Sequence, residues 1–379
     1  MSVASRSVTG LLVGLLVGLL MGLSTTAFVG GPAAASSPPA SPAPNSTLPP
    51  STPEMQVIPL TPYYSGGPTF DAYLPRDGRS RHPALIMVHG GGWQGGDKAT
   101  YAPFAVRAVT DEHWAAFAVN YRLDKTDKAA WPDELHDVQA AIRFIVAHAS
   151  TYDIDPAQVM ILGGSAGANL VALVSEVGTA DPITGHPVGA NPNLVVPINA
   201  VALWSPPVDL ADLVGSAGKP PAECGSDEAC DFIWSTPFIV DYLGCPPTEC
   251  PQTYSDASPI NRVSPRTAPS FVVASTNEIV PIDQVRAYVD ALKQDDVTVE
   301  LDELPGELHS SQYGDEVWSP TVGFLGSHLA ESGLPSSSGS NAGRAADDLA
   351  IAAVAFAVGL VVLAVLYAVL RRRRRSAGS

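Results

Sequence analysis

The stretch from Val159 to Gly167, VMILGGSAG, decides the fold of this chain. Its first four residues are apolar and predict a buried strand, while the run from Ala166 to Val177 is rich in Ala, Leu and Val and predicts a helix. Only glycine-like neighbours let a serine occupy the strained turn between such a strand and helix, where its hydroxyl projects into a cleft. The helix N-terminus adds free N–H groups and a positive dipole end. The pattern predicts Ser165 as a nucleophile, although the same spacing also occurs in ordinary glycine-rich turns.

A second glycine-rich segment follows the apolar run from Ala84 to Val88 and reads HGGGW over residues 89–93. Consecutive glycines let backbone N–H groups turn toward a negatively charged oxygen, as the tetrahedral intermediate of acyl transfer requires. We expect His89 to make a structural hydrogen bond rather than act as a base. We expect Trp93 to pack within the loop, with pocket lining as the alternative. The expected oxyanion-hole donors are Gly91, Gly92 and Ala166.

With these two motifs, the chain resembles α/β-hydrolases of the esterase and lipase group, which includes hormone-sensitive-lipase-like enzymes, feruloyl esterases and kynurenine formamidases. The resemblance covers about residues 54–332. An expected helix at 131–149, a turn at 153–156 and the segment 257–260 ahead of a late strand fit the same group. The resemblance implies an α/β-hydrolase fold, with a mostly parallel sheet flanked by helices, and a triad in the chain order serine, acid, histidine.

Among the histidines that follow Ser165, His309 has the context in which the family places its base. It follows a strand-like run and a turn, and it precedes the expected final helix at 315–329. A loop position suits an imidazole that moves between hydroxyl and leaving group, and histidine titrates near neutrality. His186 lies in a Pro- and Gly-rich loop and His328 lies within the final helix, so His309 is the expected base.

The acid is where the sequence departs from the family pattern. The family commonly has an aspartate four residues before the proline of a Val-Pro pair, and Asn277 stands at that position. An amide can accept the imidazole N–H, but it cannot stabilise imidazolium as a carboxylate does. Glu278 has a side chain one methylene longer than aspartate, so we expect its carboxylate to reach His309 in spite of the shift by one residue. Asp283 and Asp302 are the alternatives.

The expected reaction is hydrolysis of a small-molecule carboxylic ester through an acyl-enzyme on Ser165. The motifs do not distinguish an ester from an activated amide, so an amidase or formamidase is one alternative. A non-catalytic envelope protein that retained the fold is another, because Asn277 interrupts the acid pattern. We expect no metal and no other cofactor, because the spacings typical of metal ligands and of phosphate-binding loops are missing. The net charge of −17 disfavours nucleic acid as a partner, and the oligomeric state is left open.

The two ends of the chain predict export and membrane anchoring. An early arginine, an apolar run and three alanines are typical of a signal peptide, with an uncleaved membrane helix as the alternative. Near the other end, 22 uncharged residues are long enough to cross a bilayer as a helix, and the five arginines that follow put the tail in the cytoplasm and the hydrolase domain outside the cell. The expected division is signal peptide 1–35, Pro-rich linker 36–53, α/β-hydrolase domain 54–332, polar spacer 333–348, transmembrane helix 349–370 and basic tail 371–379.

All four cysteines fall within one Pro-rich, acidic insertion that follows the strand-like run ending near Trp204. An even number of cysteines in an exported chain favours disulfides over free thiols. The simplest of the three possible connectivities joins Cys224 with Cys230 and Cys245 with Cys250. The insertion is expected to be either a lid that shapes the substrate pocket or a stabilised surface loop.

Overall fold

A computed structural model of the protein describes residues 48–123, 130–180, 183, 185–215 and 238–329. The chain divides into a unit over Met1–Ala40, which lies outside those residues, and a unit over Ser41–Ser379. The expected signal peptide, the expected transmembrane helix and the basic tail also lie outside them, as do Cys224 and Cys230. Across the described ranges, no helix has both the length and the apolar character that crossing a bilayer requires.

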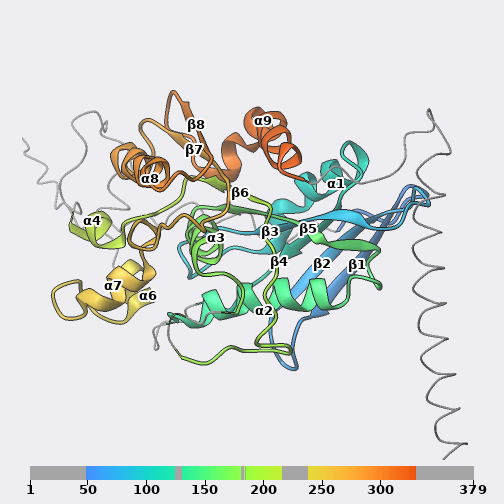
Figure 1. Ribbon diagram of the computed structural model, residues 1–379, viewed down its shortest axis with the longest axis horizontal. Coiled ribbons are helices and arrows are strands. Elements are labelled where there is room, and N and C mark those ends of the chain that lie inside the picture. Colours follow the sequence, from blue (N-terminus) through green and yellow to red (C-terminus); the bar gives the residue numbers. More distant parts are fainter. Residues whose placement is uncertain (1–47, 124–129, 181–182, 184, 216–237, 330–379) are drawn as a thin grey trace, which may run out of the picture. The chain divides into compact units, whose positions relative to one another are not determined.

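One sheet of eight strands, in the order β1-β2-β4-β3-β5-β6-β7-β8, forms the centre of the larger unit (Figure 1). β1 pairs antiparallel with β2, and β2 pairs antiparallel with β4, whereas every pairing from β4 through to β8 is parallel. This arrangement confirms the predicted α/β fold with a mostly parallel sheet. The strands are β1 (Met55–Pro62), β2 (Thr69–Pro75), β3 (His82–Val88), β4 (Ala115–Val119), β5 (Ile154–Gly164), β6 (Ala200–Trp204), β7 (Ser270–Ser275) and β8 (Val299–Leu304).

Helices connect the parallel strands, as crossover connections between parallel strands require. The α-helices are α1 (Ala102–Thr110), α2 (Asp133–Ala147), α3 (Ala166–Val177), α4 (Leu210–Gly215), α6 (Phe238–Leu243), α7 (Pro251–Ala257), α8 (Ile282–Gln294) and α9 (Gly314–Ser327). Three short 3₁₀ turns complete the described structure, namely η1 (Lys98–Tyr101), η2 (Pro259–Asn261) and η3 (Ser310–Tyr313). Of the turn expected at 153–156, only Asp153 lies in a turn, and residues 154–156 are the first residues of β5, where the pairing of β3 with β5 has an irregularity.

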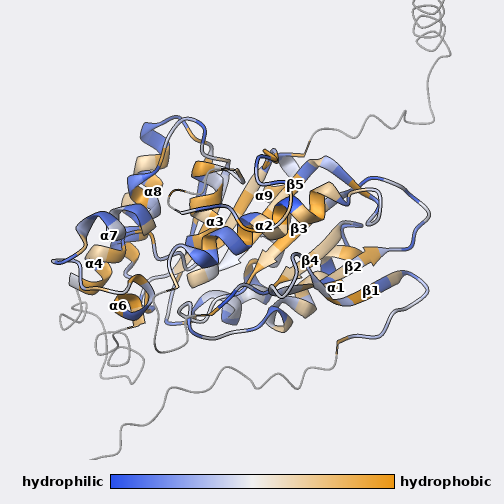
Figure 2. Cartoon of the chain, turned by 90° about the horizontal axis from the view of Figure 1, so that it is seen from below, coloured by the Kyte–Doolittle hydropathy of each residue, from blue (hydrophilic) through white to orange (hydrophobic). Residues whose placement is uncertain are grey.

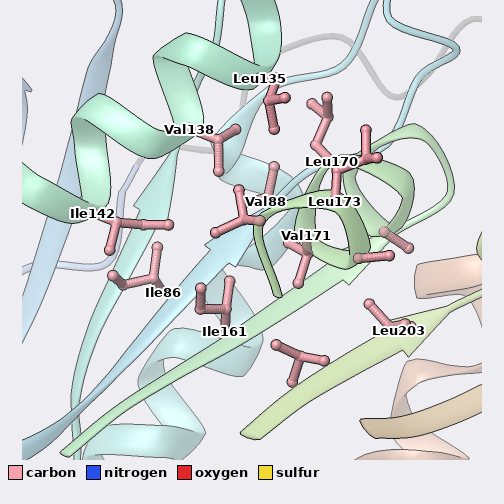
Figure 3. Close-up of a cluster of buried hydrophobic side chains, with 14 of the residues drawn as sticks. Ile86, Val88, Leu135, Val138, Ile142, Ile161, Leu170, Val171, Leu173 and Leu203 are labelled. Carbon is pink, nitrogen blue, oxygen red and sulfur yellow. The ribbon is translucent and has the colours of Figure 1, made fainter. Parts of the chain in front are cut away.

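The two faces of the sheet form separate apolar cores because successive side chains of a strand point to opposite sides. Ile86 and Val88 of β3 belong to the core that includes α2, α3 and α8, and Figure 3 draws them in one cluster with Leu135 of α2 and Leu170 of α3. Leu85 and Met87 belong to the other core, which includes α1 and α9. In Figure 2 the central strands such as β3 and β4 are coloured as mainly hydrophobic, while the helices also carry hydrophilic residues. Strands that are buried on both faces explain why the sequence has continuous apolar runs.

The parallel strands end at a common edge of the sheet, because all of them run in the same direction. The HGGGW loop follows β3, Ser165 follows β5, Glu278 lies three residues beyond β7, and His309 follows β8 by five residues. The fold therefore gathers the predicted site residues at the edge where ligands bind in open parallel sheets.

Candidate active site

Ser165 occupies a sharp turn between β5 and α3. Its backbone has φ 53° and ψ −123°, a conformation that is strained for a residue with a side chain. The turn is held by a hydrogen bond in which the Ser165 N–H donates to the Trp204 oxygen at 2.7 Å. A Cβ at Gly163 would lie 2.5 Å from the Gly167 oxygen, and a Cβ at Gly167 would lie 2.3 Å from the Val88 oxygen. Glycine is needed at both positions because backbone atoms approach so closely, which explains the local sequence.

The ring of His309 pairs with the carboxylate of Glu278. His309 Nδ1 hydrogen-bonds to Glu278 Oε2, and the glutamate side chain is fully buried. A carboxylate only accepts hydrogen bonds, so Nδ1 carries a hydrogen, and Nε2 is the ring nitrogen that can accept a proton from another group. His309 Nε2 is itself buried and has no hydrogen-bond partner among the described residues. The histidine therefore has the tautomer and the free nitrogen that a general base needs.

The loops that carry the acid and the histidine extend the pairing of β7 with β8. Beyond the last strand pair, the N–H of Thr276 donates to the Leu304 oxygen at 2.9 Å, and the N–H of Asn277 donates to the Gly306 oxygen at 2.9 Å. Asn277, which stands at the family's usual acid position, thus contributes a backbone bond that joins the two loops. Of the two alternative acids, Asp283 is highly exposed and pairs with Arg286, and Asp302 lies within β8. Among the described residues, Glu278 is the carboxylate that contacts His309.

The histidine loop packs against the serine turn. A Cβ at Gly164 would lie 2.2 Å from Ser310 Oγ and 2.3 Å from the Tyr101 hydroxyl oxygen. Gly164 precedes Ser165 and Ser310 follows His309, so the two loops are in contact one residue away from each predicted catalytic side chain. The structure thereby brings the nucleophile segment and the acid–histidine pair to one place.

The glycine loop after β3 lies beside the serine turn. A Cβ at Gly90 would lie 2.9 Å from the Cβ of Ser165, so glycine is required there by close approach. Gly91 and Gly92 have φ values of 120° and 59°, and within the described residues no carbonyl accepts from their N–H groups. The N–H of Ala166 opens α3 and has no partner within that helix. Free N–H groups at these three positions are what an oxyanion hole needs.

His89 and Trp93 both serve the packing of this loop. His89 is completely buried, its Nδ1–H donates to the Gly90 oxygen at 2.7 Å, and its ring stacks on Tyr121 with centroids 4.5 Å apart. Burial lowers the pKa of His89 to about 4, so the ring is neutral at physiological pH. The buried Trp93 ring stacks on Tyr242 of α6, with centroids 4.4 Å apart. The geometry agrees with the structural hydrogen bond and the loop packing expected from the sequence.

The segment from α6 to α7 contacts the glycine loop and contains a disulfide. Cys245 and Cys250 are bonded to each other, which confirms one of the two predicted pairings. A Cβ on Gly92 would lie 3.5 Å from the Phe238 ring, and the Gln94 side-chain amide donates to Asp241 at 3.4 Å. This cross-linked segment therefore adjoins one of the expected oxyanion donors.

Two further buried polar residues, Ser205 and Glu134, have little signal in the sequence. Ser205, directly after β6, hydrogen-bonds to Glu278, and its only sequence signal is a serine at a strand end. Glu134, in the first turn of α2, is fully buried, and its pKa is raised to about 9 mainly by burial. A glutamate in a first turn ordinarily indicates a solvated charge that favours the helix dipole, so the sequence carries no signal for this burial. Within the described ranges, no three His, Cys, Asp or Glu side chains form a group that could hold a metal ion.

A parallel sheet with a strained serine after its β5 strand and a histidine–carboxylate pair beyond β7 and β8 defines an α/β-hydrolase fold. Solved structures support this class. A truncated carbohydrate esterase from gut microbiota superposes with a TM-score of 0.61 at 22% identity, covering 72% of this chain and 96% of that one. Esterase Est2 of Thermogutta terrifontis gives a TM-score of 0.54 at 22% identity, covering 74% and 95%. Residues 70–292 match the BD-FAE family, and the chain belongs to that family.

Several curated relatives of this chain come from Mycobacterium tuberculosis. The probable carboxylic ester hydrolase LipM is 29% identical over 222 residues, which are 56% of this chain and 45% of LipM. The esterase LipQ is 29% identical over 244 residues, which are 64% of this chain and 53% of LipQ. The chain thus spans about half the length of these relatives.

Proposed function

We propose that the protein is a serine hydrolase that cleaves a carboxylic ester through an acyl-enzyme on Ser165. The observation that carries the proposal is the hydrogen bond between His309 Nδ1 and the buried Glu278, which leaves Nε2 free as a base. The contact of Gly164 with Ser310 supports it, because that contact links the serine turn to the histidine loop. A non-catalytic protein would have no need for a buried carboxylate that fixes the tautomer of an unpartnered histidine.

The proposed reaction follows from these groups. His309 Nε2 accepts the proton of the Ser165 hydroxyl while the oxygen attacks the acyl carbon, and the carbonyl oxygen becomes an oxyanion. The N–H groups of Gly91, Gly92 and Ala166 stabilise that oxyanion. The imidazolium, stabilised by Glu278, gives its proton to the leaving alcohol. A water molecule then gives a proton to the same nitrogen and attacks the acyl carbon. The bond to the serine oxygen breaks, the carboxylic acid is released, and the serine regains its proton from His309.

An ester is the proposed bond for two reasons. The relatives LipM and LipQ are named as a probable carboxylic ester hydrolase and an esterase, and the two proteins of similar structure are also named as esterases. An alkoxide leaves more readily than an amide nitrogen, so an ester makes the smaller demand on proton transfer from His309. An amidase or formamidase would use the same groups, and a comparison of substrates distinguishes the two activities.

The test is labelling with a fluorophosphonate probe, followed by turnover of aryl esters and of formylated anilines. We expect the wild-type protein and Ser175→Ala to be labelled, because Ser175 lies within α3 and donates only to the Ala172 oxygen. We expect Ser165→Ala to lose the label completely. Failure of the folded wild-type protein to react would exclude the serine mechanism, whereas faster turnover of formanilides than of esters would favour the amidase.

Export and anchoring by residues 349–370 belong to the same proposal. The Cys245–Cys250 disulfide supports an oxidising compartment, since disulfides are rare in the reducing cytosol. The test is protease treatment of intact cells that express the full chain, with fractionation of a chain truncated after residue 332. We expect the protease to degrade the hydrolase domain and the truncation to release it from the membrane. Protection of the domain in intact cells, with digestion only after lysis, would contradict the proposed orientation.

A further inference from the structure

The serine that follows β6 lies between the acid and the histidine loop. Ser205 is fully buried, its backbone has φ 53°, and its N–H donates to the Val273 oxygen at 2.7 Å. Residues other than glycine seldom adopt a positive φ, and such strain clusters at functional sites. The strained backbone of Ser205 therefore indicates that the position of its side chain is important.

Three polar groups lie within hydrogen-bonding distance of the Ser205 hydroxyl, and the chemistry of two of them fixes the direction of their hydrogen bonds. It lies 2.8 Å from Glu278 Oε1, 2.8 Å from the Ser310 nitrogen and 2.7 Å from the Tyr313 hydroxyl oxygen. An ionised carboxylate only accepts and a backbone N–H only donates, so Ser205 gives its one hydrogen to Glu278 and accepts from Ser310. Tyr313 must then donate to Ser205 or to the Val273 oxygen, which lies 3.1 Å away.

This pattern holds the carboxylate at a definite angle. Glu278 Oε1 accepts from the Ser205 hydroxyl and from the Ser275 N–H at 2.9 Å, and Oε2 is left for His309. The same hydroxyl oxygen accepts a hydrogen bond from the N–H of Ser310, the residue directly after His309. One buried oxygen therefore connects the acid and the segment that carries the base.

We propose that Ser205 is a positioning residue, which sets the Glu278–His309 pair in its productive geometry while not touching the substrate itself. The inference rests on the proposed function, since it assigns to Ser205 a part in that reaction. The hydroxyl is especially useful here because the acid is a glutamate, whose extra rotatable bond gives its carboxylate more freedom than an aspartate has. A hydrogen bond to a charged group inside the protein is strong enough to remove that freedom.

The test compares Ser205→Ala with Ser175→Ala in the full-length protein. Both variants remove one buried serine hydroxyl, but Ser175 only donates to the Ala172 oxygen within α3. We expect Ser205→Ala to lower kcat on an aryl ester about 10- to 100-fold with KM within about twofold, and Ser175→Ala to leave kcat within about threefold. Ser205→Cys keeps a side chain of similar size with a weaker donor, and we expect it to lower kcat as well even if the alanine variant does not fold.

A double-mutant cycle separates positioning from general packing. In a Glu278→Gln background the charge that Ser205 orients is absent, so we expect Ser205→Ala to lower kcat further by less than about threefold. If the losses in kcat from the Ser205 and Glu278 substitutions were fully additive, the inference would be overturned. It would also be overturned if the wild type reacted with the fluorophosphonate probe and both Ser205 variants had a kcat within about threefold of the wild-type value. A wild-type protein without any reaction would instead overturn the proposed function, and the inference with it.

Discussion

The replacement of Glu134 by glutamine tests how burial controls the pH dependence of stability. Glu134 is fully buried, and neither of its carboxyl oxygens has a hydrogen-bond partner in another described residue. Burial, with smaller contributions from the neighbouring charges of Asp137 and Asp133, raises its pKa from 4.5 to about 9. The carboxyl group is therefore neutral in the folded protein at neutral pH, while in the unfolded chain it is ionised.

The sign and size of the effect follow from that difference. Because the folded pKa is the higher one, Glu134 costs no stability below about pH 4.5, and the free energy of unfolding falls as pH rises toward 9. One pKa unit corresponds to about 1.4 kcal/mol, so the penalty reaches about 3 kcal/mol at pH 7 and about 6 kcal/mol at pH 9. Glutamine has nearly the same shape but never ionises. We therefore expect Glu134→Gln to raise the free energy of unfolding by about 3 kcal/mol at pH 7 and by almost nothing at pH 4.5.

The assay is urea unfolding of wild type and variant at several pH values between 4.5 and 9, followed by tryptophan fluorescence. Glu316→Gln is the matched control, because Glu316 lies in the first turn of α9 and is exposed. We expect that control to change stability by less than about 0.5 kcal/mol at every pH. A constant difference between wild type and Glu134→Gln across the pH range would refute the reasoning, since a proton held only by the folded state must produce a slope.

Two further substitutions probe the site itself. Glu278→Gln keeps the shape of the acid but removes its charge, so we expect kcat on an aryl ester to fall by about 10³- to 10⁴-fold. Asn277→Ala keeps the backbone hydrogen bond and should lower kcat by less than about threefold. The reverse order of the two effects would reject Glu278 as the acid. Gly164→Ala places a Cβ 2.2 Å from Ser310 Oγ, and we expect a loss of about 1–3 kcal/mol in thermal unfolding together with lower kcat. Gly323→Ala, in α9 with open space around the new Cβ, should instead stabilise by about 0.5–1 kcal/mol, and equal effects at the two glycines would contradict the proposed contact.

The serine turn and the glycine loop could be predicted from sequence because the close approach of backbone atoms there requires glycines that are adjacent or nearly adjacent in the chain. Gly163 and Gly167 are set by backbone atoms that lie too close for any side chain, and such a requirement leaves a short readable motif. The acid is harder to predict from the sequence, because Asn277 stands at the family's usual position and the choice of Glu278 depends on the reach of one extra methylene. That choice stays a prediction for catalysis, while the contact with His309 is present in the structure.

The contacts of Ser205 and the burial of Glu134 could not be predicted because they depend on packing between distant segments. Ser205 meets Glu278 from 73 positions away in the chain and Ser310 from 105. The order of the strands in the sheet brings these residues together, and no pattern within a short window specifies it. The burial of Glu134 cannot be predicted from a short window of sequence either, since it depends on contacts outside its own helix.

The chemistry depends on the outermost pairing of the sheet. β8 is the last strand in the order, and the Thr276 and Asn277 bonds that hold the acid next to the histidine continue its ladder with β7. Edge strands fray at a lower free energy than central ones, so the protein can separate the two partners by a partial opening that leaves the remaining strands paired. On heating, activity should therefore disappear at temperatures where the tryptophans of the interior are still packed. Thermal inactivation would then occur at a lower temperature than unfolding, and stabilising the pairing of β8 with β7 would protect turnover more than it raises Tm.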